Sequence, residues 1–175
     1  MKVTYLKCRP TLKFPILAWL IMIFQGQNPF NKKSSSHRAV QFGPNSIIDC
    51  TGGKGVKVNT ECNFLDKYTI VDTIDFNLDS TQSDLWHWVE TIENKPYDYL
   101  DIFGDLLRRM FNFFSFKKIG KNWDRLTCNE VALSFAKRFY NVCIGDPDVW
   151  DLILTDKLMK EISEGNYGPC NAIGS

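Results

Sequence analysis

The sequence WDRLTCNEVA at residues 123–132 predicts the start of a helix in the C-terminal half of the chain. Thr127 and Glu130 have the Ser/Thr-x-x-Glu spacing of a capping box, in which each side chain satisfies a free backbone N–H at a helix start. The spacing i, i+3, i+4 of a helix packed into a core follows at Val131, Ala132, Phe135, Ala136 and Phe139. We therefore predict a buried helix whose first helical residue is Cys128.

Cys128 has two interpretations at this position. The unpaired N–H groups and the dipole of a helix N-terminus stabilise an anion, and a cysteine thiolate is the nucleophilic form. A free cysteine on an apolar helix face is also a common core residue, so packing alone can explain it. A catalytic role requires a histidine and an orienting polar group from elsewhere in the chain.

The composition indicates one globular domain. The 175 residues are 44% hydrophobic and 14% aromatic, which is enough to bury a core. Six cysteines at irregular spacing form no C-x-x-C pair, and the chain has two histidines. We therefore expect no metal site, no cofactor and no disulfide framework, and we expect mostly free thiols in a reducing compartment.

Charge is distributed unevenly along the chain. Residues 1–48 hold seven basic and no acidic side chains, whereas the remainder holds 14 basic and 20 acidic ones. A basic face can meet a membrane surface, an anionic polymer or nucleic acid, but such charges can also merely solubilise an apolar segment. We expect no specific nucleic-acid partner.

Residues 16–24 (ILAWLIMIF) are nine consecutive apolar residues behind several positive charges, which imitates a secretory signal. The run is shorter than the roughly twenty residues that span a bilayer. The bulky Phe24 also stands where signal cleavage needs a small residue. A buried first helix explains the run as well, so we expect a cytoplasmic or virion-associated protein and not a cleaved signal peptide.

The remaining periodicity predicts an α+β fold, with a small antiparallel sheet packed against helices. Strands are expected at residues 2–7, 37–43, 46–50, 56–59 and 68–74. Helices are expected at residues 15–26, from a cap at Ser80 or Ser83 to Glu93, in the broad apolar stripe 98–116, from Cys128 onward, and at 155–163. We predict a single domain over residues 1–165 and a loose tail over 166–175.

Two histidines are available to pair with Cys128. His87 lies between tryptophans inside a predicted helix, where a packing or surface role fits better. His37 opens a predicted strand, and Asp49 lies on the next strand, twelve residues further on. A tight turn between those strands can make the two side chains neighbours, and a carboxylate can fix the tautomer of the imidazole.

Four segments carry a family resemblance, in the order SHRAV at 36–40, IIDC at 47–50 followed by Gly55-Val56, PYDYLD at 96–101 and TCNEVA at 127–132. Together they resemble the circularly permuted NlpC/P60 papain-like superfamily, over roughly residues 1–142. This superfamily includes lecithin retinol acyltransferase-like enzymes and small bacterial and phage hydrolases. Two positions depart from its pattern, because Asn129 replaces a common serine and Arg38 stands where an apolar residue is usual.

The resemblance implies a papain-like fold with Cys128 as nucleophile, His37 as base and Asp49 as orienting residue. It implies a thiol peptidase or amidase that works through an acyl-enzyme, with a peptide or a peptidoglycan stem peptide as substrate. Tyr97 and Trp123 are candidates to line a substrate groove, although aromatic residues at such positions are more often part of a core.

Two other functions stay open. A papain-like domain that has lost activity would be a structural or partner-binding component of a phage particle, with helix 98–116 and the charged N-terminus as contact surfaces. A membrane-associated lipid acyltransferase would use the apolar run 16–24 at a membrane surface and would need a lipid-sized apolar groove. Activity that depends on Cys128 separates the enzymes from the structural protein, and detergent-dependent partitioning identifies the lipid enzyme.

Overall fold

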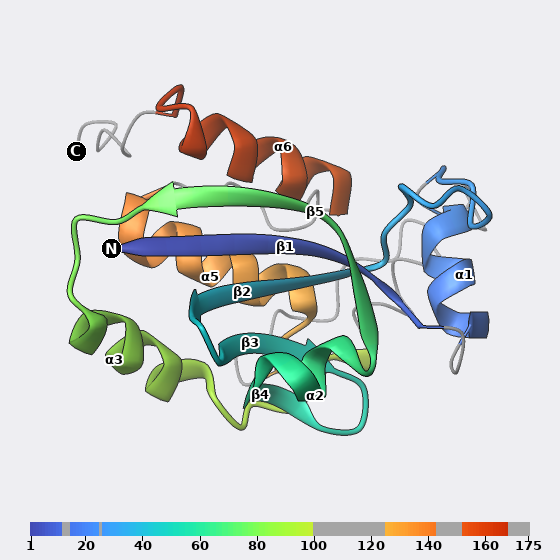
Figure 1. Ribbon diagram of the computed structural model, residues 1–175, viewed down its shortest axis with the longest axis horizontal. Helices are drawn as coiled ribbons and strands as arrows, with labels where there is room; N and C mark the ends of the chain where they lie inside the picture. Colours follow the sequence, from blue (N-terminus) through green and yellow to red (C-terminus); the bar gives the residue numbers. More distant parts are fainter. Residues whose placement is uncertain (12–14, 25, 100–124, 143–151, 168–175) are drawn as a thin grey trace, which may run out of the picture.

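A five-stranded antiparallel sheet, in the order β4-β3-β2-β1-β5, forms the centre of the computed structural model (Figure 1). The structure describes residues 1–11, 15–24, 26–99, 125–142 and 152–167. The strands are β1 (Lys2–Pro10), β2 (His37–Gly43), β3 (Ser46–Thr51), β4 (Gly55–Asn59) and β5 (Tyr68–Asn77). The helices are α1 (Pro15–Phe24), α2 (Glu61–Leu65), α3 (Gln82–Ile92), α5 (Cys128–Tyr140) and α6 (Leu152–Ser163). The predicted α+β class with a small antiparallel sheet is confirmed.

All five predicted strands form, but β1 and β5 extend beyond their predicted ends. These two strands pair along their whole length, from Lys2 opposite Asn77 to Pro10 opposite Tyr68, with a register shift between Lys7 and Cys8. Backbone pairing therefore continues past the point where the alternation of side chains stops. The two strands predicted from the sequence pattern at residues 2–7 and 68–74 were therefore too short.

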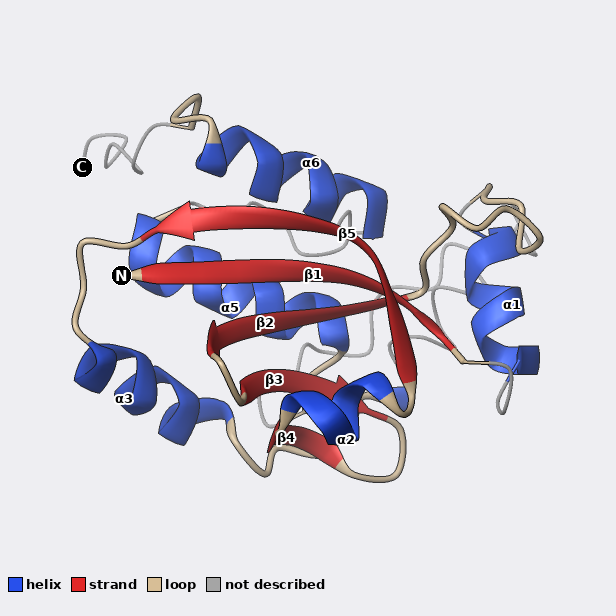
Figure 2. Cartoon of the chain, viewed as in Figure 1, coloured by secondary structure: helices blue, strands red, loops and turns tan. Residues whose placement is uncertain are grey.

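Helices cover both faces of the sheet, with α5 behind the strands and α2 in front of them (Figure 2). Residues that alternate along each strand point to opposite faces, so each face has its own core. The larger core joins all five strands to α3, α5 and α6, and it includes Tyr5, Phe42, Phe76, Trp88, Val131 and Phe135. The smaller core, on the face of α2, consists of Leu6, Cys8, Ala39, Ile47 and Phe64.

Capping residues explain where the helices begin. Thr127 and Glu130 form the predicted capping box, and α5 begins at Cys128 as expected. The prediction that Ser80 or Ser83 caps α3 is wrong, because Thr81 forms a capping box with Asp84. That spacing satisfies two backbone N–H groups at once, which neither serine achieves.

Two further helices differ from the predicted pattern. The short helix α2 was not predicted, and it begins after Thr60, whose hydroxyl accepts from the Asn63 N–H. Helix α6 begins three residues before the predicted position 155. The predicted helix at 98–116 lies almost entirely outside the described residues, and Trp123 and residues 168–175 of the predicted tail also lie outside them.

The prediction that residues 16–24 form a helix is confirmed, but the prediction that this helix is buried is wrong. Helix α1 forms, and Met22 is buried, but Ile16 is 75% exposed and Ile23 is 52% exposed. The reason is geometric: α1 lies beyond one end of the sheet (Figure 1), so the sheet does not cover it as it covers α5. Among the described helices, none is long and apolar enough to cross a membrane.

We predict that Gly55→Ala destabilises the fold by about 2–4 kcal/mol. Gly55 has a φ of +67°, and a Cβ there would overlap the carbonyl oxygen of Lys95 and lie 3.1 Å from the Cα of Pro96. The measurement is the midpoint of urea unfolding. Gly53→Ala is the matched control, because Gly53 has a φ of +82° and open space around its Cβ position. Equal losses in the two variants would contradict the steric argument.

Candidate active site

The structure brings together Cys128, His37 and Asp49, the three residues that the sequence predicted as a site. The His37 Nε2 atom lies 3.1 Å from Asp49 Oδ2, and an interaction with Cys128 is among the causes that raise the pKa of His37, so these two side chains are neighbours. Because Nε2 faces the carboxylate, Nδ1 is the ring nitrogen left for the thiol. All three side chains are buried, with His37 and Cys128 each 7% exposed and Asp49 2% exposed.

The pairing of β2 with β3 places His37 beside Asp49. Ala39 lies opposite Asp49 in this pair, and His37 precedes Ala39 by two residues, on the same face of the sheet. Residues diagonal to one another on paired strands are close enough for long side chains to meet. Helix α5 then presents Cys128 from its first turn, at the end of the sheet where β2 begins.

Asn59 holds the other oxygen of the Asp49 carboxylate. Its Nδ2 atom donates to Asp49 Oδ1 at 2.6 Å, while Oδ2 faces His37. Asn59 is the last residue of β4, which pairs with β3. The sequence analysis missed this residue, although its place on the strand next to Asp49 was the available signal. With both oxygens engaged, the carboxylate is fixed in the orientation that holds the imidazole.

Two aromatic rings from outside the predicted site hold the imidazole of His37. The Tyr68 ring stacks on it at a centroid distance of 4.3 Å and an interplanar angle of 11°, and the Phe64 ring lies at 6.3 Å. Tyr68 is the first residue of β5 and Phe64 belongs to α2. These contacts limit rotation of the ring out of the plane that joins Asp49 to Cys128.

The electrostatics favour a charged pair between Cys128 and His37. Burial disfavours the charged form of His37, but hydrogen bonds to Asp49 and Cys128 outweigh it and raise the pKa of His37 to about 9. Burial likewise disfavours the Cys128 thiolate, but the hydrogen bond and charge of His37, with further help from Arg38, lower the pKa of Cys128 below its usual value. Each group therefore stabilises the charged form of the other near neutral pH.

Backbone amides at the start of α5 are candidate donors to the site. The side chain of Thr127 accepts from the Glu130 N–H at 3.3 Å, and Glu130 Oε2 accepts from the Thr127 N–H at 2.7 Å. The cap thus leaves the intervening amides of Cys128 and Asn129 at the helix N-terminus, where anions are stabilised. The backbone N–H of Arg38 is also among the causes that lower the pKa of the Cys128 thiol. A nucleophile, a base, an orienting carboxylate and amide donors in one place are the groups that acyl transfer requires.

A pocket of about 680 Å³ adjoins His37. Its apolar and aromatic lining includes Tyr68, Tyr97 and, from α1, Ile16, Ala18 and Ile21. Charged side chains of Lys54, Asp66 and Lys67 also line it. Tyr97, one of the two substrate-contact candidates from the sequence, belongs to this lining, whereas the second candidate, Trp123, falls outside the described residues.

The second histidine and the remaining described cysteines do not belong to this site. His87 is exposed on α3 and pairs with Glu90 at 3.1 Å. Cys8, Cys50 and Cys62 are free thiols, as is Cys128 of the site. Within the described ranges, no group of three or more His, Cys, Asp or Glu side chains is arranged to hold a metal ion.

Comparisons with models of known protein families, with characterised proteins and with solved structures gave no match to this chain. The NlpC/P60 resemblance therefore stays a prediction from the sequence motifs. Any functional conclusion depends on the geometry of the described residues.

We predict that Thr127→Ala lowers the free energy of unfolding by about 1 kcal/mol and also slows alkylation of Cys128. Loss of the cap lets the first turn of α5 fray, and this turn positions the sulfur and its amide donors. The measurements are thermal unfolding and iodoacetamide alkylation mapped by peptide mass spectrometry. Thr81→Ala is the matched control, because Thr81 forms the same capping box on α3. The prediction is wrong if both variants alkylate alike.

We predict that Cys128 of the wild type alkylates with a midpoint below the ordinary thiol value of about 8.5, and that His37→Ala moves the midpoint up toward that value. The reason is that the His37 imidazolium stabilises the thiolate. The measurement is the rate of iodoacetamide labelling between pH 5 and 10. Cys62, which is exposed, serves as an internal control in the same digests. An unchanged midpoint in His37→Ala would show that no functional pair exists.

Proposed function

We propose that this chain is a cysteine hydrolase with a papain-like fold that cleaves an amide or peptide bond through an acyl-enzyme on Cys128. The observation that carries the proposal is the buried series in which Cys128 interacts with His37 and His37 pairs with Asp49 at 3.1 Å. Packing alone does not account for it, since a buried cysteine in a core needs neither a hydrogen-bonded imidazole nor a carboxylate behind that imidazole. The α5 helix start and the antiparallel sheet behind it are consistent with the permuted papain-like order.

In the first half of the reaction, the Cys128 thiolate attacks the substrate carbonyl carbon. A C–S bond forms and the π electrons of the carbonyl move to its oxygen. Amide donors at the start of α5 can stabilise this oxyanion, a contribution of about 3 kcal/mol per donor in enzymes of this kind. The His37 imidazolium gives its proton to the leaving nitrogen as the C–N bond breaks, which leaves a thioester and a neutral imidazole.

In the second half, water hydrolyses the thioester. Neutral His37 takes a proton from the attacking water, and the new C–O bond produces a second tetrahedral intermediate. This intermediate collapses with cleavage of the C–S bond, which releases the acid and restores the thiolate–imidazolium pair. Asp49 keeps its charge throughout, and it holds the imidazole in the tautomer and orientation that both halves need.

The first substrate candidate is a peptide, such as a peptidoglycan stem peptide. Charged side chains of Lys54, Asp66 and Lys67 in the pocket offer partners for the charged groups of such a peptide. Tyr97 adds an aromatic surface on which an apolar part of the substrate can pack.

A specific observation favours a second candidate, a lipid acyl substrate. The pocket beside His37 is bounded by apolar side chains of α1, and Ile16 and Ile23 of this helix are exposed. Residues 1–48 are basic and carry no acidic side chain, which suits an anionic membrane surface. The chemistry at Cys128 is the same for this substrate, with an ester oxygen in place of the amide nitrogen.

We predict Cys128-dependent turnover with a bell-shaped pH profile. Activity rises with pH as Cys128 ionises, and it falls near pH 9 as His37 loses the proton that the leaving group needs. Alkylation needs the thiolate alone, so its rate has no alkaline decline. The measurement compares peptidoglycan stem peptides with fatty acyl esters presented in mixed micelles.

Cys128→Ala tests whether any turnover belongs to this site, and Cys62→Ala is the matched control for loss of an unrelated thiol. Turnover of peptides supports the first candidate, and turnover of acyl esters that grows with chain length supports the second. A wild-type chain that labels quickly at Cys128 yet turns over neither class would contradict the proposal and would favour a partner-binding protein.

A further inference from the structure

Arg38 is completely buried, on the opposite face of β2 from His37. In the NlpC/P60 superfamily, which the sequence resembles, an apolar residue is usual at this position. A guanidinium removed from water is strongly destabilising unless its donors are paired in good geometry. The contacts of this side chain therefore indicate what it does that an apolar residue would not.

Arg38 joins α6 to the backbone of the site. Its Nε donates to Asp156 Oδ1 and its Nη2 donates to Asp156 Oδ2, both at 2.7 Å, in a bidentate fork. Its Nη1 donates to the carbonyl oxygen of His37 at 2.9 Å. One planar group thus fixes both a carboxylate on α6 and the peptide unit that carries the proposed base.

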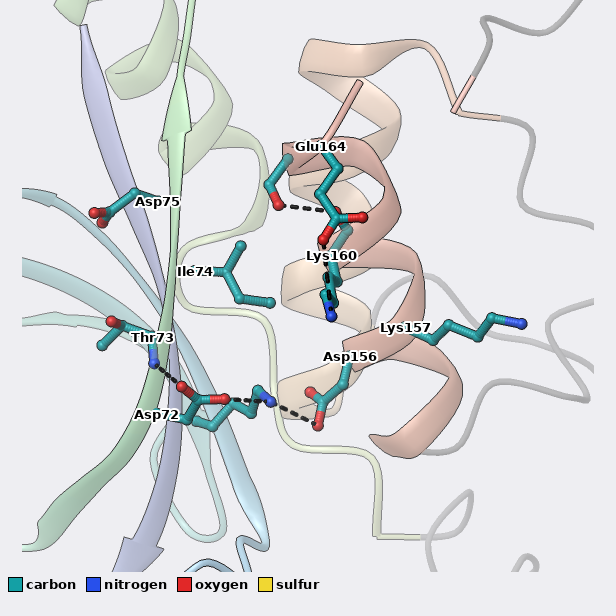
Figure 3. Close-up of a pocket in the computed structure, with 10 residues that line it drawn as sticks. Asp72, Thr73, Ile74, Asp75, Asp156, Lys157, Lys160 and Glu164 are labelled. Carbon is teal, nitrogen blue, oxygen red and sulfur yellow. Dashed lines mark hydrogen bonds and ion pairs between the residues drawn. The ribbon is translucent and has the colours of Figure 1, made fainter. Parts of the chain in front are cut away.

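Asp156 is held in turn from the other side. The Tyr5 hydroxyl donates to Asp156 Oδ1 at 2.8 Å, and Lys7 Nζ lies 3.8 Å from Oδ2 and 2.7 Å from Asp72. Figure 3 shows Asp72 and Asp156 on the two sides of a groove between β5 and α6, with a lysine amine between them. Tyr5 and Lys7 therefore hold the Asp156 carboxylate independently of Arg38.

Arg38 also acts on the sulfur. Its backbone N–H and its positive charge are both among the causes that lower the pKa of the Cys128 thiol. Tyr5, Cys8, Cys50, Tyr68 and Tyr97 also interact with Cys128, but burial raises the pKa of each, so they are neutral at pH 7. Among these described groups around the thiol, His37 and Arg38 supply the positive charge.

We propose that Arg38 and Asp156 are a positioning pair, in which Asp156 orients the guanidinium and Arg38 holds the His37 backbone and stabilises the Cys128 thiolate. The inference rests on the proposed function, because it needs the Cys128–His37 pair. It goes further because it gives Asp156, a residue of α6, a part in the reactivity of the Cys128 sulfur. Neither residue lines the pocket beside His37, so both act through Cys128 and His37.

The test is the pH profile of Cys128 alkylation in the double variant Arg38→Met/Asp156→Leu. Removing both charges leaves no unpaired buried ion, and apolar replacement of a buried ion pair is often tolerated by a fold. We expect a folded protein by circular dichroism whose alkylation midpoint rises by about one pH unit, with labelling at pH 6 slowed about tenfold. A purely structural pair would leave the midpoint where it is.

The matched control is Lys157→Ala/Glu161→Ala, which removes an exposed ion pair from the same helix. Its midpoint should equal that of the wild type. A double variant that folds and keeps the wild-type midpoint overturns the inference while leaving the Cys128–His37 pair intact. A wild type without a lowered midpoint overturns the proposed function instead.

Arg38→Lys decides the question if the double variant does not fold. Lysine keeps the charge but lacks the planar fork, so it cannot bind Asp156 twice and also reach the His37 carbonyl. We expect a smaller upward shift of the midpoint, by about half a unit, with slower labelling at pH 6. A Lys variant with wild-type rate and midpoint would overturn the positioning role.

Discussion

The register of β2 against β3 is the constraint on which the rest of the site depends. Ala39 pairs with Asp49, so His37 reaches the carboxylate on one face and Arg38 reaches α6 on the other. A slip by one residue would exchange these two faces and bury each side chain against the wrong partner. Because the two neighbouring residues face opposite ways, a single register setting fixes both ion pairs around Cys128.

The second organising feature is the burial of two charged side chains, Asp49 and Arg38, for which the fold provides fixed partners. Asp49 is held by His37 and Asn59, while Arg38 is held by Asp156 and the His37 carbonyl. Partners of this kind replace water, whose reorientation would otherwise accompany each change of charge during a reaction. The sheet and helices supply the rigidity that keeps these partners in place.

The sequence predicted the parts of the site that depend on local signals. Thr127 and Glu130 locate the start of α5, and the turn after β2 brings Asp49 toward His37. Asp156 could not be predicted, since it meets Arg38 across a separation of 118 residues without any local pattern. The burial of residues 16–24 was mispredicted for a related reason. An apolar run shows that a segment favours burial, but the packing of elements distant in sequence decides how much of that segment is covered.

The central position of β2 has a consequence for how the protein loses its chemistry. This strand is hydrogen-bonded to β1 on one side and to β3 on the other, and it carries both His37 and Arg38. Fluctuations that free a single edge strand of the sheet leave β2 paired, so opening of an edge does not release His37 or Arg38. Heat or denaturant should therefore displace these two side chains only in the cooperative transition that disrupts the sheet.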